Sequence, residues 1–594
     1  MYPAAAVHRN VKLGAQVLLS SRALNSPRRQ QRSTASAERA QSISETDKFL
    51  HYNAEDGYYK TSPFEPITVP NVPLHQYVWR DFKKWEKKTA AVCVVSDRQY
   101  TYAQLRDASA ALAVRLQTKF KLFKPDVIAI CMPNLPEYPI AALGAIEAAL
   151  TVTTVNPVYT PDEIARQLTF SDAKLIIGTV QGYATLREAC QLAKKDLPIV
   201  VVRTSNDQAL PPGAVDFAEL IRTEDVRYDE LRSPSDASAD DIVFLPFSSG
   251  TTGLPKGVVL SHNNITSNCE QIHGGLTINT LEFQDTLPGV LPFFHIYGLT
   301  VVMLSKLGLG CRLATMPAFK PDEFIKSLDF YKGSVLNIVP PIVLFMINHP
   351  KLTQEIAPNL RAVMTGAAPI GQHDVERFLK KFPKARFMQG YGMTEASPVV
   401  LLTPEGNTRY ASTGVLPPNT ESKIVPLDGD NVKGLGPRTT GELCVRGPQV
   451  MSGYLNNEEA NKVTFYPGNW LRTGDVAFYD EEGFFYITDR MKELIKVKGF
   501  QVPPAELEAV LRDHPKILEA AVFGIPHEVN GEAPRAIVVL RPNEGATAEE
   551  IAEYVAGRVA HYKKLEGGVI FVDEVPKNPT GKILRKDLKA KFSS

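Results

Sequence analysis

The chain has 594 residues, and its 66 Lys and Arg residues balance 65 Asp and Glu residues to a net charge of +1. One hydrophobic core rarely serves such a length, so we expect two or more domains. The neutral balance excludes a general basic surface, so nucleic acid is not an expected partner. No apolar run reaches the ~18 residues of a membrane-spanning helix, and even the stretch 291–313 is broken by His295, Lys306 and Arg312. Six scattered cysteines without a CxxC pair indicate a reducing compartment.

The N-terminal segment differs from the rest of the chain. Residues 1–37 carry six Lys and Arg residues and no acidic residue, amid many Ala and Ser residues. This composition is typical of an amphipathic mitochondrial transit peptide. We expect residues 1–45 to be a transit peptide or disordered, and the protein to reach the mitochondrial matrix. A disordered basic tail, with a cytoplasmic or peroxisomal location, is the alternative.

Helical and extended patterns alternate between residues 47 and 244. Such alternation predicts parallel sheets flanked by helices. The expected helices span 102–116, 140–150 and 183–193, and the expected strands span 126–132, 174–178 and 199–203. The Pro-, Ser- and Asp-rich run 233–241 is typical of a linker.

A loop rich in Gly, Ser and Thr follows this region. The sequence SSGTTGLPKGV begins at Ser248 and lies between two short apolar runs, 242–245 and 258–260, which we expect to be buried strands. Glycines let the backbone approach an anion closely, and N–H groups and hydroxyls can surround phosphate oxygens. Lys256 adds a mobile charge. The spacing differs from that of a Walker loop, and the alternative is an ordinary surface hairpin.

Further polar motifs are spread over the remaining chain. LPFFHIYG contains His295, a residue type that more often fills a core than catalyses when it stands alone among apolar neighbours. LRAVMTGAAPI, from residue 360, predicts a strand and a small-residue turn suited to lining a pocket. QGYGMTEASP offers Tyr391 for stacking on a base, a hydroxyl at Thr394 and a hard oxygen ligand for Mg²⁺ at Glu395. In WLRTGD, Asp475 could accept hydrogen bonds from ribose hydroxyls.

The last hundred residues predict a small α/β module. Pro503 and Pro504 suit the first turn of a helix, Thr547 and Glu550 predict a capping box, and strands are expected at 520–525, 536–540 and 569–572. The loop PKNPTGKILRK, from residue 576, carries Lys582.

Taken together and in this order, these motifs closely resemble those of the adenylate-forming superfamily, and most of all the 4-coumarate:CoA ligases and related medium-chain or aryl acyl-CoA synthetases. The resemblance runs from about residue 70 to the C-terminus. It implies an α/β fold with a large N-terminal domain of mixed sheets flanked by helices and a small mobile C-terminal α/β domain. The implied boundaries are 46–489 for the N-terminal AMP-binding domain, 490–492 for a hinge and 493–594 for the C-terminal domain.

The implied reaction is an acid–thiol ligation that consumes ATP with Mg²⁺. A carboxylate would attack the α-phosphate to give an acyl-adenylate, and coenzyme A would then displace AMP to form a thioester. A luciferase-like oxidation and an inactive acyl- or nucleotide-binding protein are the alternatives. The resemblance predicts neither the acid nor the oligomeric state.

The resemblance also assigns roles to residues. Catalysis would involve Lys582, His295, Thr394 and Glu395, and the metal would be bound by Glu395 and Thr251. His295 would gate the acyl tunnel, and Lys492 would be the hinge residue. The acyl pocket would be lined by His295, Tyr297, Gly366, Ala367 and Ala368. ATP and coenzyme A would be bound by Ser248, Ser249, Gly250, Thr251, Thr252, Gly253, Lys256, Gln389, Gly390, Tyr391, Asp475, Arg490, Lys492, Lys496, Lys498, Gly499 and Gln501.

Overall fold

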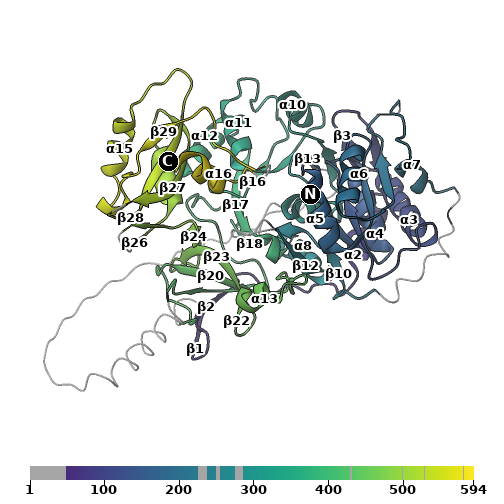
Figure 1. Cartoon of the computed structure of the whole chain (residues 1–594), viewed down its shortest axis with the longest axis horizontal. Helices are drawn as coiled ribbons and strands as arrows, with labels where there is room; N and C mark the ends of the chain where they lie inside the picture. Colours follow the sequence, from purple (N-terminus) through teal and green to yellow (C-terminus); the bar gives the residue numbers. More distant parts are fainter. Residues whose placement is uncertain are drawn as a thin grey trace, which may run out of the picture. The chain divides into compact units, whose positions relative to one another are not determined.

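The structure is a computed structural model that describes residues 48–593 apart from 206, 225, 227–236, 249–254, 274–284, 429–430, 498–499, 528 and 579–580. The chain divides into two compact units, Met1–Lys48 and Phe49–Ser594. The second unit carries every element described below (Figure 1). The predicted transit peptide, 1–45, and residues 233–236 of the predicted linker, 233–241, lie outside the described residues.

A nine-stranded sheet forms the first part of the second unit, in the order β11-β12-β10-β6-β5-β7-β8-β9 with β21 on β12. From β10 through β6, β5, β7 and β8 to β9 the neighbours are parallel, as the alternating pattern predicted. Its strands are β5 (Val127–Ile130), β6 (Thr151–Thr154), β7 (Ala173–Thr179), β8 (Ile199–Val202), β9 (Val215–Asp216), β10 (Ile242–Phe244), β11 (Phe247–Ser248), β12 (Lys256–Ser261) and β21 (Gly453–Tyr454). The helices of this part are α3 (Tyr102–Thr118), α4 (Glu137–Glu147), α5 (Pro161–Ser171), α6 (Tyr183–Leu192), α7 (Phe217–Leu220) and α8 (His262–His273).

Local sequence signals explain where several of these helices begin. Thr101 and Gln104 form a complete capping box at the start of α3, and Thr160 and Glu163 form another at α5, where Pro161 occupies the first turn. The predicted helices and strands between residues 102 and 203 are therefore confirmed.

The second unit also contains two four-stranded sheets. One has the order β13-β14-β3-β4 and the other β15-β16-β17-β18. Their strands are β3 (Thr89–Cys93), β4 (Gln99–Thr101), β13 (Thr286–Gly289), β14 (Arg312–Thr315), β15 (Val335–Ile338), β16 (Ala362–Thr365), β17 (Arg386–Gly392) and β18 (Val399–Leu402). The helices here are α2 (Leu74–Trp79), η1 (Phe82–Lys84), the π-helix η4 (Tyr297–Leu304), α9 (Ser305–Leu307), α10 (Pro321–Asp329), α11 (Pro340–Asn348), α12 (Gln372–Lys381) and η5 (Thr394–Ala396). Among the described residues no helix is long and apolar enough to cross a bilayer.

The third kind of sheet is a seven-stranded antiparallel sheet, whose last strand, β24, directly precedes the C-terminal module in the chain. It has the order β1-β2-β19-β20-β23-β22, with β24 on β23. Its elements are β1 (Leu50–Asn53), β2 (Gly57–Thr61), β19 (Glu421–Val425), β20 (Gly441–Arg446), α13 (Glu458–Thr464), β22 (Phe465–Tyr466), β23 (Trp470–Tyr479) and β24 (Phe485–Arg490).

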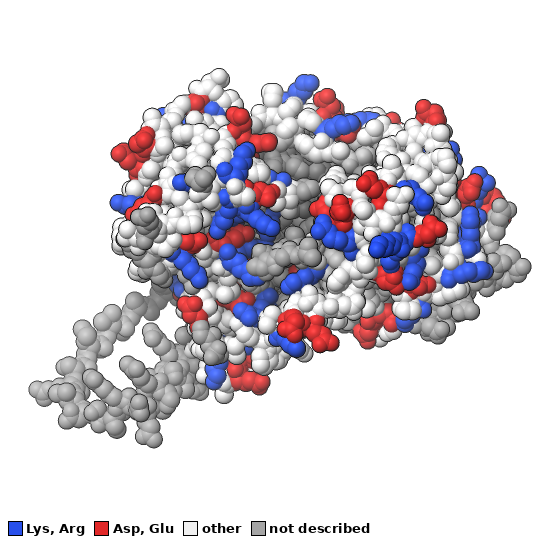
Figure 2. Space-filling model, in the orientation of Figure 1, with Lys and Arg blue, Asp and Glu red and all other residues white. Residues whose placement is uncertain are grey.

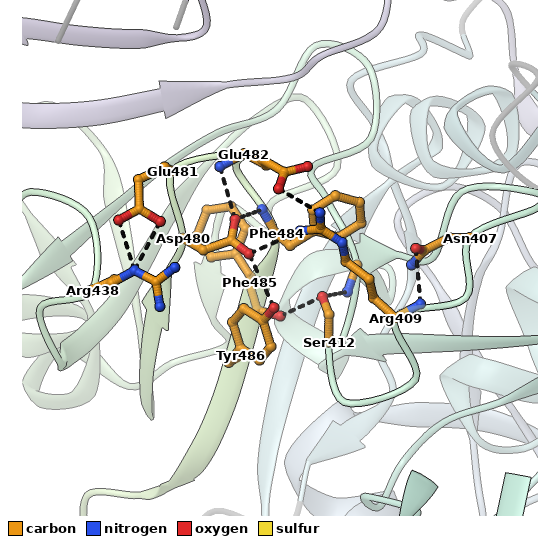
Figure 3. Close-up of polar contacts among 11 residues, drawn as sticks. Asn407, Arg409, Ser412, Arg438, Asp480, Glu481, Glu482, Phe484, Phe485 and Tyr486 are labelled. Atoms are coloured by element: carbon orange, nitrogen blue, oxygen red, sulfur yellow. Dashed lines mark hydrogen bonds and ion pairs between the residues drawn. The ribbon is translucent and has the colours of Figure 1, made fainter. Parts of the chain in front are cut away.

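The turn between β23 and β24 is held to an earlier loop by polar contacts (Figure 3). The Arg409 guanidinium pairs with Asp480 at 3.3 Å and with Glu482. The Ser412 hydroxyl donates to the Phe485 carbonyl oxygen at 3.0 Å. These contacts fix the segment after β18 against β24.

The C-terminal module is a five-stranded sheet in the order β26-β25-β28-β27, with β29 on β28. Leu507 and Ile551 belong to one of its hydrophobic clusters and Leu588 to a second, so its helices cover two faces. Its elements are β25 (Ile495–Val497), β26 (Phe500–Val502), α14 (Pro504–Arg512), β27 (Ile517–His527), β28 (Gly531–Leu540), α15 (Ala548–Ala556), η6 (His561–Lys563), β29 (Val569–Phe571) and α16 (Arg585–Phe592).

One local prediction in this module is corrected. The Thr547 hydroxyl accepts from the Glu550 N–H at 3.1 Å, which is half of the predicted capping box. The Glu550 carboxylate does not accept from the Thr547 N–H, which would complete the box, because it pairs with the Lys516 Nζ at 2.7 Å. The helix begins as predicted, with a single cap bond.

Candidate active site

A cavity of about 280 Å³ opens where the C-terminal module meets the rest of the second unit. Its walls include Ala367 and Ala368 after β16, Gln389 to Tyr391 on β17, and Lys582 from the C-terminal module. On the face shown in Figure 2, Lys and Arg side chains lie around the hollow in the middle of the view, with Asp and Glu side chains among them. Residues more than two hundred positions apart therefore meet in one site.

Asp475 is the acidic centre of the cavity. In the register of β23 and β24 it lies opposite Arg490, and its Oδ1 pairs with the Arg490 Nε at 3.0 Å. The Tyr391 hydroxyl donates to the Asp475 Oδ2. Burial raises the pKa of the Asp475 carboxyl, and the Arg490 charge opposes that rise. The carboxylate is thus held by one cation and one hydroxyl, facing the cavity.

Lys582 enters this cavity on a tight loop. The Asn578 Oδ1 accepts from the Lys582 N–H at 2.9 Å, and Gly581 has a φ of +79°, which favours glycine. A Cβ at Gly581 would lie 3.2 Å from carbons of Pro341 on α11, so the loop packs closely there. Burial, aided by the Arg490 charge, lowers the pKa of Lys582 to about 8. The Lys582 charge in turn opposes the rise in the pKa of Asp475, so the two groups interact.

Arg585 connects the Lys582 loop to the module around it. Its guanidinium pairs with Glu493, just before β25, and with Glu508 on α14, and its Nε donates to the Val522 carbonyl oxygen at 3.1 Å. All of these groups are at least half-buried. The loop PKNPTGKILRK pointed to Lys582, but nothing in the sequence indicated which acids Arg585 would meet.

Glu395 forms a second polar centre. Its buried carboxylate accepts, through Oε1, from the Ser248 hydroxyl at 2.9 Å and from the Tyr454 hydroxyl at 2.9 Å. The Lys256 Nζ lies over the Tyr454 ring, 4.7 Å from its centroid. Ser248 and Lys256 are opposite each other in the β11–β12 pairing, so the loop between them begins and ends beside Glu395. Tyr454 was not predicted as a site residue, because no motif marks it.

The cavity lining does not include the predicted residues His295, Tyr297, Gly366 and Thr394. Gly366 stands behind it, and a Cβ there would lie 3.1 Å from the Gly390 carbonyl oxygen and 3.4 Å from the Tyr297 ring. Thr394, in η5, and His295 also do not line it. Burial lowers the pKa of His295 to about 4, and its Nδ1 accepts from the Tyr297 N–H at 3.3 Å. The π-helix that follows, a form often found at functional sites, was not predicted.

The remaining predicted residues belong to the hinge and the two glycine-bearing loops. Burial, together with the Lys256 charge, lowers the pKa of Lys492. The Lys496 side chain is exposed on β25. The following lie outside the described residues: Ser249, Gly250, Thr251, Thr252, Gly253, Lys498 and Gly499, together with the side chain of Gln501.

Comparison with known families agrees with this architecture. A family model described as AMP-binding enzyme matches residues 78–455, and the model of the AMP-binding enzyme C-terminal domain matches residues 506–582. The chain therefore belongs to the AMP-binding enzyme family.

Individual relatives indicate which class of enzyme within this family the chain resembles. The chain is 38% identical to 4-coumarate–CoA ligase 1 of Solanum tuberosum over 90% of its own length and 96% of that protein. It is 39% identical to 4-coumarate–CoA ligase 3 of Oryza sativa subsp. japonica, over 91% and 96%. The expected class, an AMP-forming acid–CoA ligase that uses ATP and coenzyme A, is confirmed.

Solved structures show the same fold. ATP-bound MatB from Rhodopseudomonas palustris matches with a TM-score of 0.78 at 25% identity, covering 88% of this chain and 99% of that one. A benzoate CoA ligase from Burkholderia xenovorans LB400 matches with a TM-score of 0.75 at 25% identity, covering 87% and 99%. The expected fold, a large N-terminal domain of mixed sheets and helices with a small C-terminal α/β domain, is confirmed.

Proposed function

We propose that the protein activates an aryl or medium-chain carboxylic acid with MgATP and transfers the acyl group to coenzyme A. The observation that carries this proposal is the meeting of Lys582 with Asp475, Arg490 and Tyr391 in one cavity. That arrangement supplies nucleotide recognition on one side and a partly dehydrated cation on the other. The reaction needs both features, because the carboxylate of the acid and the α-phosphate of ATP are two anions that must approach each other.

Nucleotide binding would use the groups on β17, β23 and β24. Tyr391 offers a ring for stacking on adenine beside Gln389 and Gly390, where the backbone is open to the cavity. Asp475 and Arg490 would hold the ribose hydroxyls. The Tyr391 hydroxyl already donates to Asp475, so a ribose hydroxyl would share or replace that contact.

The polar centre at Glu395 suits a magnesium ion held with ATP. The Glu395 carboxylate is buried, and a carboxylate oxygen is a hard ligand that suits Mg²⁺. The Ser248 and Tyr454 hydroxyls both donate to its Oε1. Among the described residues no cluster of three or more His, Cys, Asp or Glu side chains could hold a metal alone. Mg²⁺ commonly takes one or two carboxylates and completes its shell with phosphate oxygens and water. When bound, it would neutralise charge on the phosphates.

The residues around Glu395 would arrange the triphosphate. Lys256 and the loop that begins at Ser248 would hold the β- and γ-phosphates, Thr394 would contact phosphate, and Thr251 would be the second metal ligand. Lys256 is close to this centre, over the Tyr454 ring.

Lys582 would act in the first half-reaction. A carboxylate oxygen of the acid attacks the α-phosphorus, a new P–O bond forms, and the bond to the pyrophosphate oxygen breaks with its electron pair. The Lys582 ammonium would lie between the two anions and stabilise the charge that develops on the phosphorus oxygens. In the second half-reaction the thiol sulfur attacks the acyl carbon and AMP leaves.

The two half-reactions would use two orientations of the C-terminal module. The structure has the orientation in which Lys582 faces Asp475. Rotation at the hinge, 490–492 with Lys492 as its pivot, would withdraw Lys582 and present Lys496, Lys498, Gly499 and Gln501 to coenzyme A. The domain limits 46–489 and 493–594 follow from that hinge, and His295 would gate the acyl tunnel beside Tyr297.

The acid can be identified by a direct assay. CoA-dependent AMP release by the full chain should be measured with 4-coumarate, cinnamate, benzoate and medium-chain fatty acids. AMP and pyrophosphate should appear only with an acid present, and the acid with the highest kcat/KM names the substrate class. Release of ADP, or AMP release independent of any acid, would refute the proposal.

We also propose that the protein is mitochondrial and takes part in fatty or aryl acid metabolism in that compartment. The proposal rests on the basic residues of the first 45 positions. Cytoplasm and peroxisome are the alternatives.

A further inference from the structure

A second pocket, of about 350 Å³, adjoins the catalytic cavity and has a different chemistry. Arg512, the last residue of α14, lines both. The pocket is formed from two parts of the fold, the first turns of α12 and the segments after α14 and β28, and α12 lies beside the C-terminal sheet in Figure 1. Its lining comprises His373, Arg377, Arg512, Asp513, His514, Pro515 and Arg541.

The arginines of this pocket have capacity left for a ligand. Arg377 pairs with Asp374 at 3.1 Å and donates to Asn348 at 3.0 Å. Arg541 uses its Nε for the Pro515 carbonyl oxygen at 3.0 Å. Within the part of the chain that the structure describes, the Arg512 side chain makes no hydrogen bond or ion pair.

Three guanidinium groups around one pocket repel one another unless an anion lies between them. Asp513 is the one acid in the lining, so the pocket keeps a positive balance. Guanidinium groups match phosphate oxygens through pairs of N–H bonds. His373 lies in the first turn of α12, where the helix end favours negative charge.

We propose that this pocket binds a phosphate group, carried either by a nucleotide or by orthophosphate. The ligand would contact Arg377 on one side and Arg512 and Arg541 on the other. Because these residues belong to different domains, the bound phosphate would hold the C-terminal module in the orientation that brings Lys582 to Asp475. This consequence, though not the binding itself, rests on the proposed function and its rotating module.

The binding test uses the full chain with adenosine added to saturate the catalytic cavity without supplying phosphate. Orthophosphate and adenosine 3′,5′-bisphosphate are titrated separately by calorimetry into the wild type, Arg541→Gln and the control Arg558→Gln. Arg558 is an exposed arginine of the same module outside the pocket. We expect wild type and Arg558→Gln to bind alike, and Arg541→Gln to bind at least tenfold more weakly.

Each outcome decides the proposal. Similar affinity for both probes shows that phosphate alone is recognised, and a nucleotide preference of tenfold or more identifies a nucleotide ligand. No binding by the wild type, or equal binding by wild type and Arg541→Gln, overturns the site. If Arg541→Gln fails to fold, Arg377→Gln tests the same pocket from α12.

A second measurement separates the site from the proposed function. Orthophosphate should slow thioester formation from supplied acyl-adenylate in the wild type and not in Arg541→Gln. Binding without any such slowing would leave the phosphate site in place and refute the link to module rotation. Absence of ligase activity together with intact binding would refute the proposed function alone.

Discussion

Asp475 and Arg490 face each other across the β23–β24 pairing and form an ion pair of 3.0 Å on the wall of the catalytic cavity. Arg490 is the last residue of β24 and the first residue of the proposed hinge, 490–492. Asp489, the next residue back, accepts from the Ala505 N–H on α14 at 2.9 Å, and burial raises its pKa to about 7. Arg490, which we propose holds the ribose, and Asp489, which contacts α14, are therefore neighbours at the end of β24.

Lys582→Ala should strongly slow adenylate formation while sparing thioester formation from supplied acyl-adenylate. Loss of the cation removes stabilisation of the developing charge, and we expect a fall of roughly 10²–10³-fold in the first half-reaction. Single-turnover assays of each half-reaction measure this. Lys586→Ala, at an exposed position on α16, is the control and should leave both steps unchanged. Equal slowing of both steps by Lys582→Ala would contradict the assigned role.

The pH dependence of kcat/KM for ATP should report the titration of the Lys582 ammonium. Burial lowers the pKa of its ammonium to about 8, so the active cation is present below that pH and is lost as the pH rises through it. We expect kcat/KM to fall about tenfold per pH unit well above 8. Lys582→Arg should remove this alkaline fall, whatever its absolute rate, because a guanidinium does not deprotonate. An unchanged alkaline limb in that variant would assign the titration to another group.

Tyr454→Phe should weaken the use of magnesium. The hydroxyl donates to the Glu395 Oε1, and losing one such hydrogen bond costs about 1 kcal/mol, or roughly fivefold in the Mg²⁺ concentration required. AMP release measured against Mg²⁺ concentration checks this. Tyr183→Phe, which removes a hydroxyl that contacts the Pro212 carbonyl oxygen far along the chain, is the control. A Mg²⁺ dependence equal to that of wild type would exclude Tyr454 from positioning Glu395.

Arg585→Met should destabilise the C-terminal module. Glu508 is buried and would lose its cation, and breaking such a pair costs about 3–5 kcal/mol. Hydrogen exchange of the β27 and β28 amides is the suitable measurement, because the three Trp residues, 79, 85 and 470, lie outside the module. The double variant Arg585→Met with Glu508→Gln should recover much of the loss. Equal protection in wild type and Arg585→Met would show that the pair contributes little.

A reporter fused to residues 1–45 should enter mitochondria. Its basic residues and lack of early acids provide the positive amphipathic character of a matrix signal. Fractionation or microscopy measures this, and replacing the six Lys and Arg residues of positions 1–37 with Gln should abolish import. A reporter that stays in the cytosol would point to the disordered-tail interpretation.

The sequence by itself determined the elements and the chemistry available to them. Helix starts such as Thr101 and Thr160 are local signals, since the cap and its partner are three residues apart. The alternating pattern before residue 244 likewise defined parallel strands. The order of the motifs, from Ser248 to Lys582, was sufficient for the family and the reaction class.

Only the tertiary structure decided which of these groups meet. Tyr454 reaches Glu395 because β21 pairs with β12, and Arg585 binds Glu493 and Glu508 because the C-terminal sheet brings three separate segments together. Arg377 and Arg541 share a pocket for the same reason. The spacing of residues along the sequence does not predict these contacts. They depend on which strands pair with each other, and the packing of the whole hydrophobic core determines that pairing.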